Sequence, residues 1–313
     1  MDICTFSDEL VEYAKVQKMQ DLSILPTVEG MTLIFSKSYY RQMYRKVTTE
    51  DAQQLITRFK FLGGMEVGEK RRAQLGAISY PLADGEQRIR VSTVGDFQGQ
   101  ESLVLRFLHP LGKFHRFFMN EQYETIADAC RYRELYLFSG PTGSGKSTLM
   151  YRLASAAAGQ VITIEDPVEI VEPRFLQLQT NPMIGQDYDE LIRLSLRHRP
   201  ELLLIGEIRN KETAKAAIRA ALTGHRVFAT IHARGLTETI ARLQELTEEA
   251  AVIDQCLQGI IYQRLLPDLH GVPHALMAYT FYEPHKSSMT WDQALTRIRE
   301  KEQITHEVFD KEK

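Results

Sequence analysis

Residues 135–150 read LYLFSGPTGSGKSTLM, and this stretch decides the fold. Its first five residues form an apolar run that predicts a buried strand, and the residues after Lys146 are typical of a helix. Between them stands the pattern G-x-x-x-x-G-K-[ST], whose glycines let backbone N–H groups surround phosphate oxygens at a helix N-terminus. This order predicts an α/β domain that binds a nucleotide. The candidate phosphate-binding residues are Gly140, Pro141, Thr142, Gly143, Ser144, Gly145, Lys146, Ser147 and Thr148.

Two side chains of this loop have distinct expected roles. Lys146 should reach the β and γ phosphate oxygens, and Ser147 should offer its hydroxyl to Mg²⁺. The sequence therefore predicts ATP and Mg²⁺ as ligands. The alternative, a glycine-rich structural turn, requires the whole pattern to arise by chance between a strand and a helix.

Three further apolar runs follow the loop, at 161–165 (VITIE), 202–206 (LLLIG) and 227–231 (VFATI). Helical stretches separate these runs, and strands that alternate with helices predict a parallel sheet. The chain after about residue 234 has a mostly helical pattern and ends in polar residues.

The run at 202–206 leads directly into Glu207, the first carboxylate there that could face a γ-phosphate. A carboxylate at the end of a core strand is costly unless a metal, a cation or a reacting water requires it. Glu207 is therefore predicted to hold a metal-bound or attacking water and to accept its proton. The alternative is a surface ion pair with Arg209.

The run at 161–165 ends in the same way, at Glu165 followed by Asp166 and Pro167. Two carboxylates at the carboxyl edge of a parallel sheet lie where ligands bind in such sheets. The alternative is a turn with solvated acids, since Asp-Pro is also a common turn signal.

Two histidines, His225 and His232, flank the run at 227–231. Their spacing is not that of a zinc site, and no cysteine or carboxylate pair lies nearby in the sequence. Taken alone, each is more often a structural histidine than a functional one.

The first 108 residues predict a smaller α+β domain. Apolar residues recur at helical spacing from Phe6, and a second amphipathic helix follows a capping sequence that starts at Thr48. Strands are expected at 31–36, at 87–94 and at 102–108, and Arg106 interrupts the apolar run of the last one. A buried guanidinium needs an anion, which would be either a bound nucleotide or an internal acid such as Glu69 or Glu101.

A chain of 313 residues has room for about two domains. The sequence HPLG at 109–112 marks the expected boundary. The expected parts are an α+β domain at 1–108, a linker with a first helix at 109–134, and a nucleotide-binding domain with a helical C-terminal part at 135–313.

The composition limits the function classes. A net charge of −3, with 25% charged residues, gives no basic footprint for nucleic-acid binding. Three widely separated cysteines argue against a disulfide framework or a zinc site and fit a reducing cytosol. No apolar run approaches the ~18 residues of a membrane span, and the N-terminus lacks the core of a signal peptide. We therefore expect a cytoplasmic protein.

Four segments in a fixed order carry a family resemblance: GPTGSGKST, ITIEDPVE, LLLIGEIRN and TGHRVFATIHA. Together they resemble the secretion/traffic ATPase superfamily, whose members drive type II secretion and the assembly or retraction of type IV pili. The first domain is similar more weakly, through EKRRAQ at 69–74 and RVSTVGDFQGQESLVLRFL at 90–108. The resemblance covers roughly residues 20–270. It implies a RecA-like ATPase domain preceded by a PAS-like domain.

The resemblance also implies roles for single residues. Glu165 would organise the metal and the water, Glu207 would be the catalytic carboxylate and hold Mg²⁺ through water, and His232 would contact the γ-phosphate. Arg90 and Arg106 would reach from the first domain to neutralise phosphate charge on their own chain's nucleotide. It further implies a ring of about six subunits on the cytoplasmic face of the membrane. The ring would bind a pilus or secretion platform protein of the inner membrane, without direct contact to nucleic acid.

The chain departs from the family pattern at several positions. Ala73 stands where the family usually has proline, Arg199-Pro200-Glu201 replaces Asp-Pro-Asp, and Asn210 replaces the aspartate after GEIR. The four-cysteine zinc module of many members is missing. A short, zinc-free member is most similar to the competence-pilus assembly ATPases of Gram-positive bacteria, which support DNA uptake. The alternatives are a retraction or type II secretion motor, a nucleotide-binding regulator with low turnover, and a nucleic-acid translocase.

Overall fold

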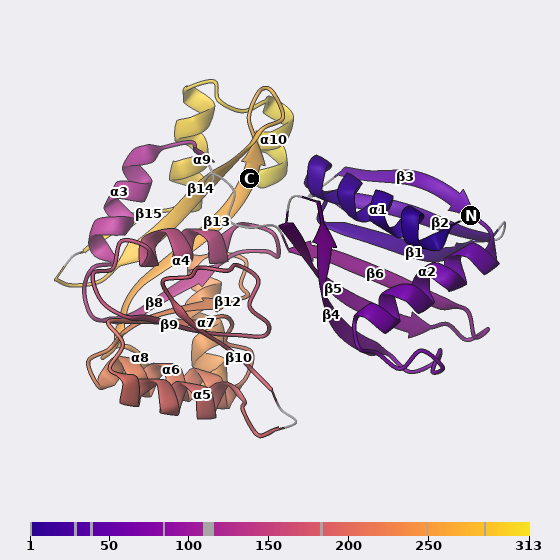
Figure 1. The fold of residues 1–313 in the computed structure, drawn as a ribbon. Coiled ribbons are helices and arrows are strands. Elements are labelled where there is room, and N and C mark those ends of the chain that lie inside the picture. The colour runs from indigo at the N-terminus through magenta and orange to yellow at the C-terminus, as the bar shows by residue number, and fades with distance from the viewer. Residues whose placement is uncertain are drawn as a thin grey trace. The chain divides into compact units, whose positions relative to one another are not determined.

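The structure is a computed structural model that describes residues 2–27, 30–37, 40–83, 85–108, 116–181, 184–248, 250–284 and 286–313. The chain forms two compact units, Met1–Pro110 and Leu111–Lys313, and each is described by itself (Figure 1). The boundary expected at 109–112 lies outside the described residues.

In the described part of the first unit, six strands form an antiparallel sheet in the order β3-β2-β1-β6-β5-β4. Two helices cover one face of this sheet, as Figure 1 shows. The elements are α1 (Ile3–Gln17), β1 (Asp21–Thr27), β2 (Gly30–Lys37), β3 (Tyr40–Val47), α2 (Thr49–Leu62), β4 (Gln74–Leu82), β5 (Gly85–Gly95) and β6 (Glu101–Leu108).

Both helices of the first unit and the alternation along β5 agree with the sequence pattern. The Thr48 side chain accepts a hydrogen bond from the Asp51 backbone N–H and caps α2. Strand β3 was not predicted from the sequence, because this strand is largely exposed and rich in polar residues and so shows no apolar alternation. The strand expected at 102–108 is present as β6. Arg106 interrupts its apolar run but not the strand, because the side chain lies on the exposed face of β6, away from the core.

The described part of the second unit is built around a mixed sheet of nine strands, in the order β10-β9-β11-β12-β8-β13-β14-β15 with β7 beside β14. The strands from β10 to β13 are parallel, and β14 and β15 are antiparallel additions. The strands are β7 (Arg116–Phe117), β8 (Glu134–Ser139), β9 (Val161–Glu165), β10 (Leu176–Gln179), β11 (Leu202–Ile205), β12 (Arg226–Ile231), β13 (Leu257–Pro267), β14 (Pro273–Phe281) and β15 (Ser287–Met289).

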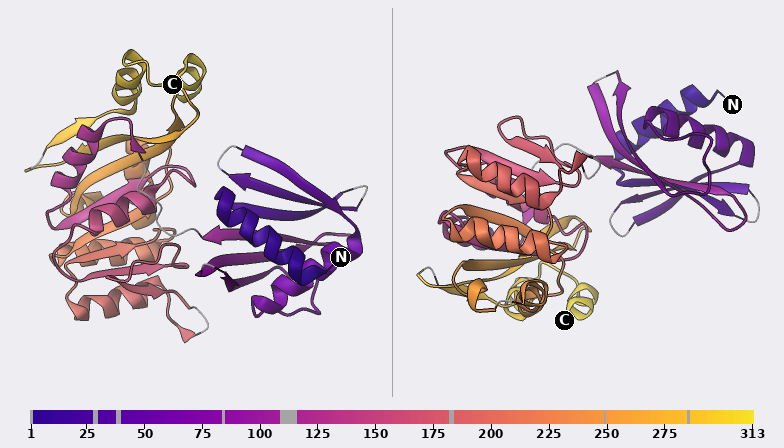
Figure 2. Two further views of the ribbon diagram at one scale, coloured as in Figure 1. Left: turned by 45° about the horizontal axis from the view of Figure 1, so that its top comes forward. Right: turned by 90° about the horizontal axis from the view of Figure 1, so that it is seen from below.

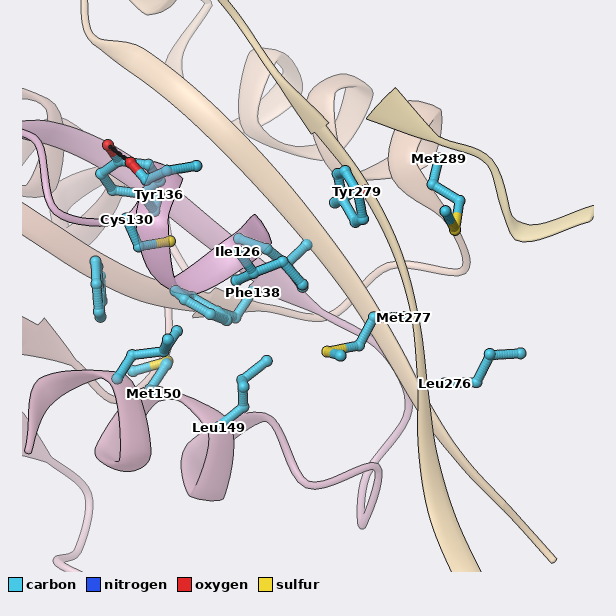
Figure 3. Close-up of a cluster of buried hydrophobic side chains, with 14 of the residues drawn as sticks. Ile126, Cys130, Tyr136, Phe138, Leu149, Met150, Leu276, Met277, Tyr279 and Met289 are labelled. Carbon is cyan, nitrogen blue, oxygen red and sulfur yellow. Dashed lines mark hydrogen bonds between the residues drawn. The ribbon is translucent and has the colours of Figure 1, made fainter. Parts of the chain in front are cut away.

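Helices cover both faces of this sheet (Figure 2). Leu135 and Leu137 of β8 face one apolar cluster, whereas Tyr136 and Phe138 face the other. Figure 3 shows the second cluster, to which α3, α4 and α9 contribute. The helices are α3 (Asn120–Ala129), α4 (Lys146–Ala154), α5 (Tyr188–Ser195), the 3₁₀ turn η2 (Leu196–His198), α6 (Lys211–Leu222), α7 (Leu236–Thr247), α8 (Ala250–Ile253), α9 (Trp291–Glu300) and α10 (His306–Glu312).

The predicted α/β fold, with a mostly parallel sheet preceded by a smaller α+β unit, is confirmed. The chain after residue 234 is not mostly helical, because it also supplies the long strands β13 and β14. Most of β13 is buried, so it lacks the polar alternation that reveals a strand in sequence. Among the described residues, no helix is long and apolar enough to cross a membrane.

Parallel strands place all their carboxyl ends at one edge of the sheet. The loop after β8, the acids at the ends of β9 and β11, and the histidine after β12 therefore converge at this edge. The fold places there the loop, Glu165, Asp166, Glu207 and His232 among the residues that the sequence analysis selected.

Candidate active site

The loop between β8 and α4 has the backbone of a phosphate cradle. Gly140, Gly143 and Gly145 adopt positive φ angles of 139°, 78° and 86°, which residues with a side chain rarely adopt. At Gly140 a Cβ atom would also lie only 2.2 Å from the backbone oxygen of Gln263. The glycines are therefore required by the conformation of the loop.

Lys146 starts α4 and is held inside the loop. Its ammonium group donates hydrogen bonds to the carbonyl oxygens of Gly140 and Pro141, both at 2.9 Å. The residue is only 8% exposed. Burial lowers the pKa of Lys146 to about 8, although the charges of Glu207 and Glu169 oppose this shift. A bound phosphate would supply the anion that such a buried ammonium requires.

The start of α4 fits a nucleotide phosphate and Mg²⁺. The first N–H groups of a helix have no partner within the helix, and Gly145, the residue before α4, has no side chain to cap them. These N–H groups, together with Lys146, can bind phosphate oxygens. Ser147 lies in the same first turn, where its hydroxyl could serve as a metal ligand. The described residues contain no cluster of three or more His, Cys, Asp or Glu that could hold a metal alone.

Glu165 ends β9 and is held by two hydrogen bonds. The Tyr151 hydroxyl donates to its Oε1 at 2.5 Å, and the Thr163 hydroxyl donates to the same oxygen at 2.7 Å. Gln177 donates to the Tyr151 oxygen at 2.7 Å, which leaves the phenol proton for Glu165. Burial raises the pKa of Glu165, and the two hydrogen bonds partly offset this effect because they favour the ionised form.

Glu207 follows β11 and lies beside the end of β9. Gly206 allows this close approach, because a Cβ there would lie 3.1 Å from the carbonyl oxygen of Ile164 and 3.2 Å from the Cα of Glu165. The Glu207 side chain is 18% exposed, and its Oε1 lies 3.4 Å from Nε2 of His232. The structure thus brings together Glu207 and His232 from the ends of two neighbouring strands.

The second oxygen of Glu207 pairs with Arg209 at 2.5 Å. Arg209 also lies 3.4 Å from Asp166 and so joins the acids that follow β9 and β11. The ion pair of the alternative interpretation is therefore present. However, the low exposure of Glu207 and its approach to His232 distinguish it from an ordinary surface pair.

His225 lies away from this edge. It precedes β12, and its Nδ1 lies 3.2 Å from the carbonyl oxygen of Ala220 near the end of α6. His225 and His232 therefore lie at opposite ends of β12. We assign His225 the structural role that the sequence left open.

Arg90 and Arg106 both belong to the first unit. They lie opposite each other in the register of β5 and β6, and Asp21 of β1 is the next residue in that row. Arg106 is not buried as its apolar neighbours suggested. Its side chain is 47% exposed and pairs with Asp21 at 2.8 Å. The catalytic role of the two arginines stays a prediction.

The acids that we considered as partners of Arg106 have other contacts. Glu101 forms a fully buried ion pair with Lys60 at 2.6 Å. Glu69 accepts hydrogen bonds from the backbone N–H groups of Arg71 and Arg72. The internal ion pair of the alternative interpretation is therefore present, but its acid is Asp21, which lies directly beside Arg106 in the sheet.

Comparison with known proteins now identifies the family. Residues 3–303 match the model of the type II/IV secretion system protein family. The chain belongs to this family. It is 43% identical over 294 residues to competence protein ComGA of Streptococcus pneumoniae, and the aligned region covers 92% of this chain and 93% of that protein. Competence protein ComGA of Bacillus subtilis is 34% identical over 270 residues, covering 83% of this chain and 75% of that protein.

Solved structures show the same fold. The ATPase DotB of Legionella pneumophila superposes with a TM-score of 0.78 at 21% identity, covering 98% of this chain and 94% of that chain. The pilus retraction motor PilT with bound ADP superposes with a TM-score of 0.71 at 23% identity, covering 98% and 96%. At these identities the likeness extends to the fold alone. Together with the family match, these relatives confirm the expectation of a secretion-family ATPase.

Several residues at this edge of the secretion-family chain were missed in the sequence. Tyr151 stands four residues after Ser147, so helical spacing could have placed both on the same face of α4. Thr163 precedes Glu165 by two residues in β9 and therefore shares its face of the strand.

Asn210, noted as a departure from the family, caps α6 because its side-chain oxygen accepts a hydrogen bond from the backbone N–H of Thr213 at 2.9 Å. Asparagine caps a helix about as well as aspartate, so this substitution preserves the local structure.

Proposed function

We propose that the protein is the ATP-hydrolysing motor that powers assembly of a competence pilus, a type IV-like fibre for DNA uptake. The observation that carries this proposal is the 43% identity to a competence protein over nearly the full length of both chains. The likeness to a retraction motor, at 23% identity, supports only the fold. Assembly is therefore favoured over retraction.

Each site residue would have a distinct role in ATP hydrolysis. Lys146, Ser147 and the N–H groups at the start of α4 would hold the β and γ phosphates and Mg²⁺. When bound, Mg²⁺ neutralises charge on the phosphate oxygens. Glu207 would accept a proton from the attacking water, and the ion pair with Arg209 would keep its carboxylate in place. Glu165 would position water and metal, and His232, beside Glu207, would contact the γ-phosphate.

We further infer that the motor works as a homo-oligomeric ring, of about six subunits as in the family. It would act on the cytoplasmic face of the membrane with a platform protein of the pilus as its partner. The net charge of −3 argues against direct contact between this protein and nucleic acid, because phosphate backbones bind basic surfaces. The first domain, residues 1–108, would move against the ATPase domain, residues 135–313, during the cycle.

The arginines of the first domain would stabilise charge on the nucleotide of their own chain. The two arginines lie opposite each other in neighbouring strands, and this local concentration of positive charge favours binding of an anion such as phosphate. Mixed rings of Arg90→Ala and Glu207→Gln chains should then stay inactive, because no subunit has a complete site. Recovered ATPase activity would show that Arg90 acts across a subunit boundary.

Pilus formation in a transformable host separates the candidate functions. A strain that lacks the gene is complemented with the wild type, with Glu207→Gln, or with Glu124→Gln, which changes an exposed carboxylate of α3. We expect surface pili and transformation with the wild type and with Glu124→Gln, and neither with Glu207→Gln. Abundant pili without transformation in the Glu207→Gln strain would instead indicate a retraction motor. Normal pili and transformation in that strain would indicate a regulator that does not depend on turnover.

A further inference from the structure

Strand β13 carries a buried glutamine beside the phosphate-binding loop. The strand pairs with β8, the strand that leads into the loop, and their register ends with Tyr262 opposite Ser139. Gln263 is the next residue of β13 and is 2% exposed. The pairing of β13 with β8 therefore places Gln263 next to the loop.

Gln263 contacts the loop at two points. Its side-chain Nε2 donates a hydrogen bond to the carbonyl oxygen of Ser144 at 2.6 Å. Its backbone oxygen lies only 2.2 Å from the position that a Cβ atom of Gly140 would take. The same residue thus touches the first glycine of the loop and the residue before its last glycine.

Apart from its contact with the loop, the core gives no reason for a polar side chain at position 263. A buried carboxamide costs free energy unless its polar atoms find partners, and β13 is otherwise mostly apolar. Among the described residues its Oε1 has no hydrogen-bond partner, and neither has the buried hydroxyl of Ser144. An apolar side chain would therefore suit this position better, unless the loop requires the N–H donor.

We propose that Gln263 is a positioning residue that holds the phosphate-binding loop in the conformation that receives a nucleotide. This inference rests on the proposed function, because it assumes that the loop binds nucleotide phosphates. The three glycines of the loop have more backbone freedom than other residues. If the loop becomes ordered only when the nucleotide binds, the lost conformational entropy lowers the affinity. The bond from Gln263 to Ser144 restricts the loop before the ligand arrives.

The test is nucleotide affinity in Gln263→Met, which keeps the length of the side chain and removes the N–H donor. Titration with a fluorescent ADP analogue and Mg²⁺ should give a Kd about tenfold higher than that of the wild type. Gln258→Met is the matched control, because Gln258 lies on the same strand, is 5% exposed and donates to the carbonyl oxygen of Tyr282 at 3.0 Å, away from the loop. We expect its Kd to stay within about twofold of the wild type.

A merely structural role makes a different prediction. It would lower the melting temperature of both variants by similar amounts and leave the Kd of folded Gln263→Met unchanged, which would overturn the inference. If Gln263→Met does not fold, Gln263→Asn decides, because it keeps a neutral carboxamide but is one methylene too short to donate to the Ser144 carbonyl. We expect that variant to lose at least as much affinity, and wild-type affinity would overturn the inference. If the wild type itself does not bind the analogue, the proposed function fails instead.

Discussion

The phosphate-binding loop and the acidic edge of the same sheet are built in different ways. The loop is one continuous stretch, residues 140–148, and its contacts come from backbone N–H groups and one lysine. The acidic edge is assembled from the ends of β9, β11 and β12, and its geometry depends on side-chain contacts such as those from Tyr151 and Arg209. The difference suggests that nucleotide binding and hydrolysis can be removed separately by mutation.

The largest expected effect on the loop follows from Lys146→Ala. The variant removes the cation that the loop offers to the phosphates, and a lost charge-assisted hydrogen bond costs up to about 3 kcal/mol, or roughly a hundredfold in Kd. Titration with a fluorescent ATP analogue checks this. Unchanged affinity would contradict the assignment of residues 140–148 as a phosphate cradle.

At the acidic edge, Tyr151→Phe should affect turnover and spare binding. The variant removes one of the two donors that fix Glu165, a loss of about 2 kcal/mol and roughly thirtyfold in kcat if Glu165 positions the water. The affinity for ATP should stay within about twofold. Tyr136→Phe is the control, since the Tyr136 hydroxyl donates to the Ala129 carbonyl oxygen in the core. Equal losses of kcat in both variants would return Tyr151 to a purely structural role.

A smaller effect is expected from pH acting on the loop alone. Phosphate binds the protonated form of Lys146, so affinity should fall as pH rises through the pKa of about 8 that burial gives this group. ADP binding measured in EDTA should weaken roughly tenfold between pH 8 and pH 9.5. In Lys146→Arg the guanidinium stays charged, so the weaker binding of that variant should not change over this range. An equal decline in both proteins would mean that another group titrates.

The sequence predicts the loop and the strand ends well because their signals are local. The pattern at 140–147 requires a turn between a strand and a helix, and apolar runs that end in Glu165 and Glu207 mark strand ends at a parallel-sheet edge. Parallel topology then brings distant residues together, and the approach of His232 to Glu207 follows from it. The roles of these residues in catalysis remain predictions.

Contacts that depend on tertiary packing could not be read from the sequence. Strand β13 is buried on both faces, so its apolar run could equally be a helix segment, and the contact from Gln263 to the loop went unseen. Arg106 among apolar residues suggested a buried charge. Residues on one strand alternate between faces, and only the pairing of β6 with β1 shows that Arg106 faces solvent beside Asp21.

The most direct test of the account is the identity of the nucleotide that stays bound to Glu207→Gln after incubation with MgATP. The amide preserves the shape of the side chain but cannot accept a proton, so binding should remain and turnover should fall by about two or more orders of magnitude. We predict that nucleotide released from the washed variant is mainly ATP, whereas the wild type treated alike yields ADP. If Glu207→Gln yields ADP at the wild-type rate, Glu207 is not the group that drives hydrolysis.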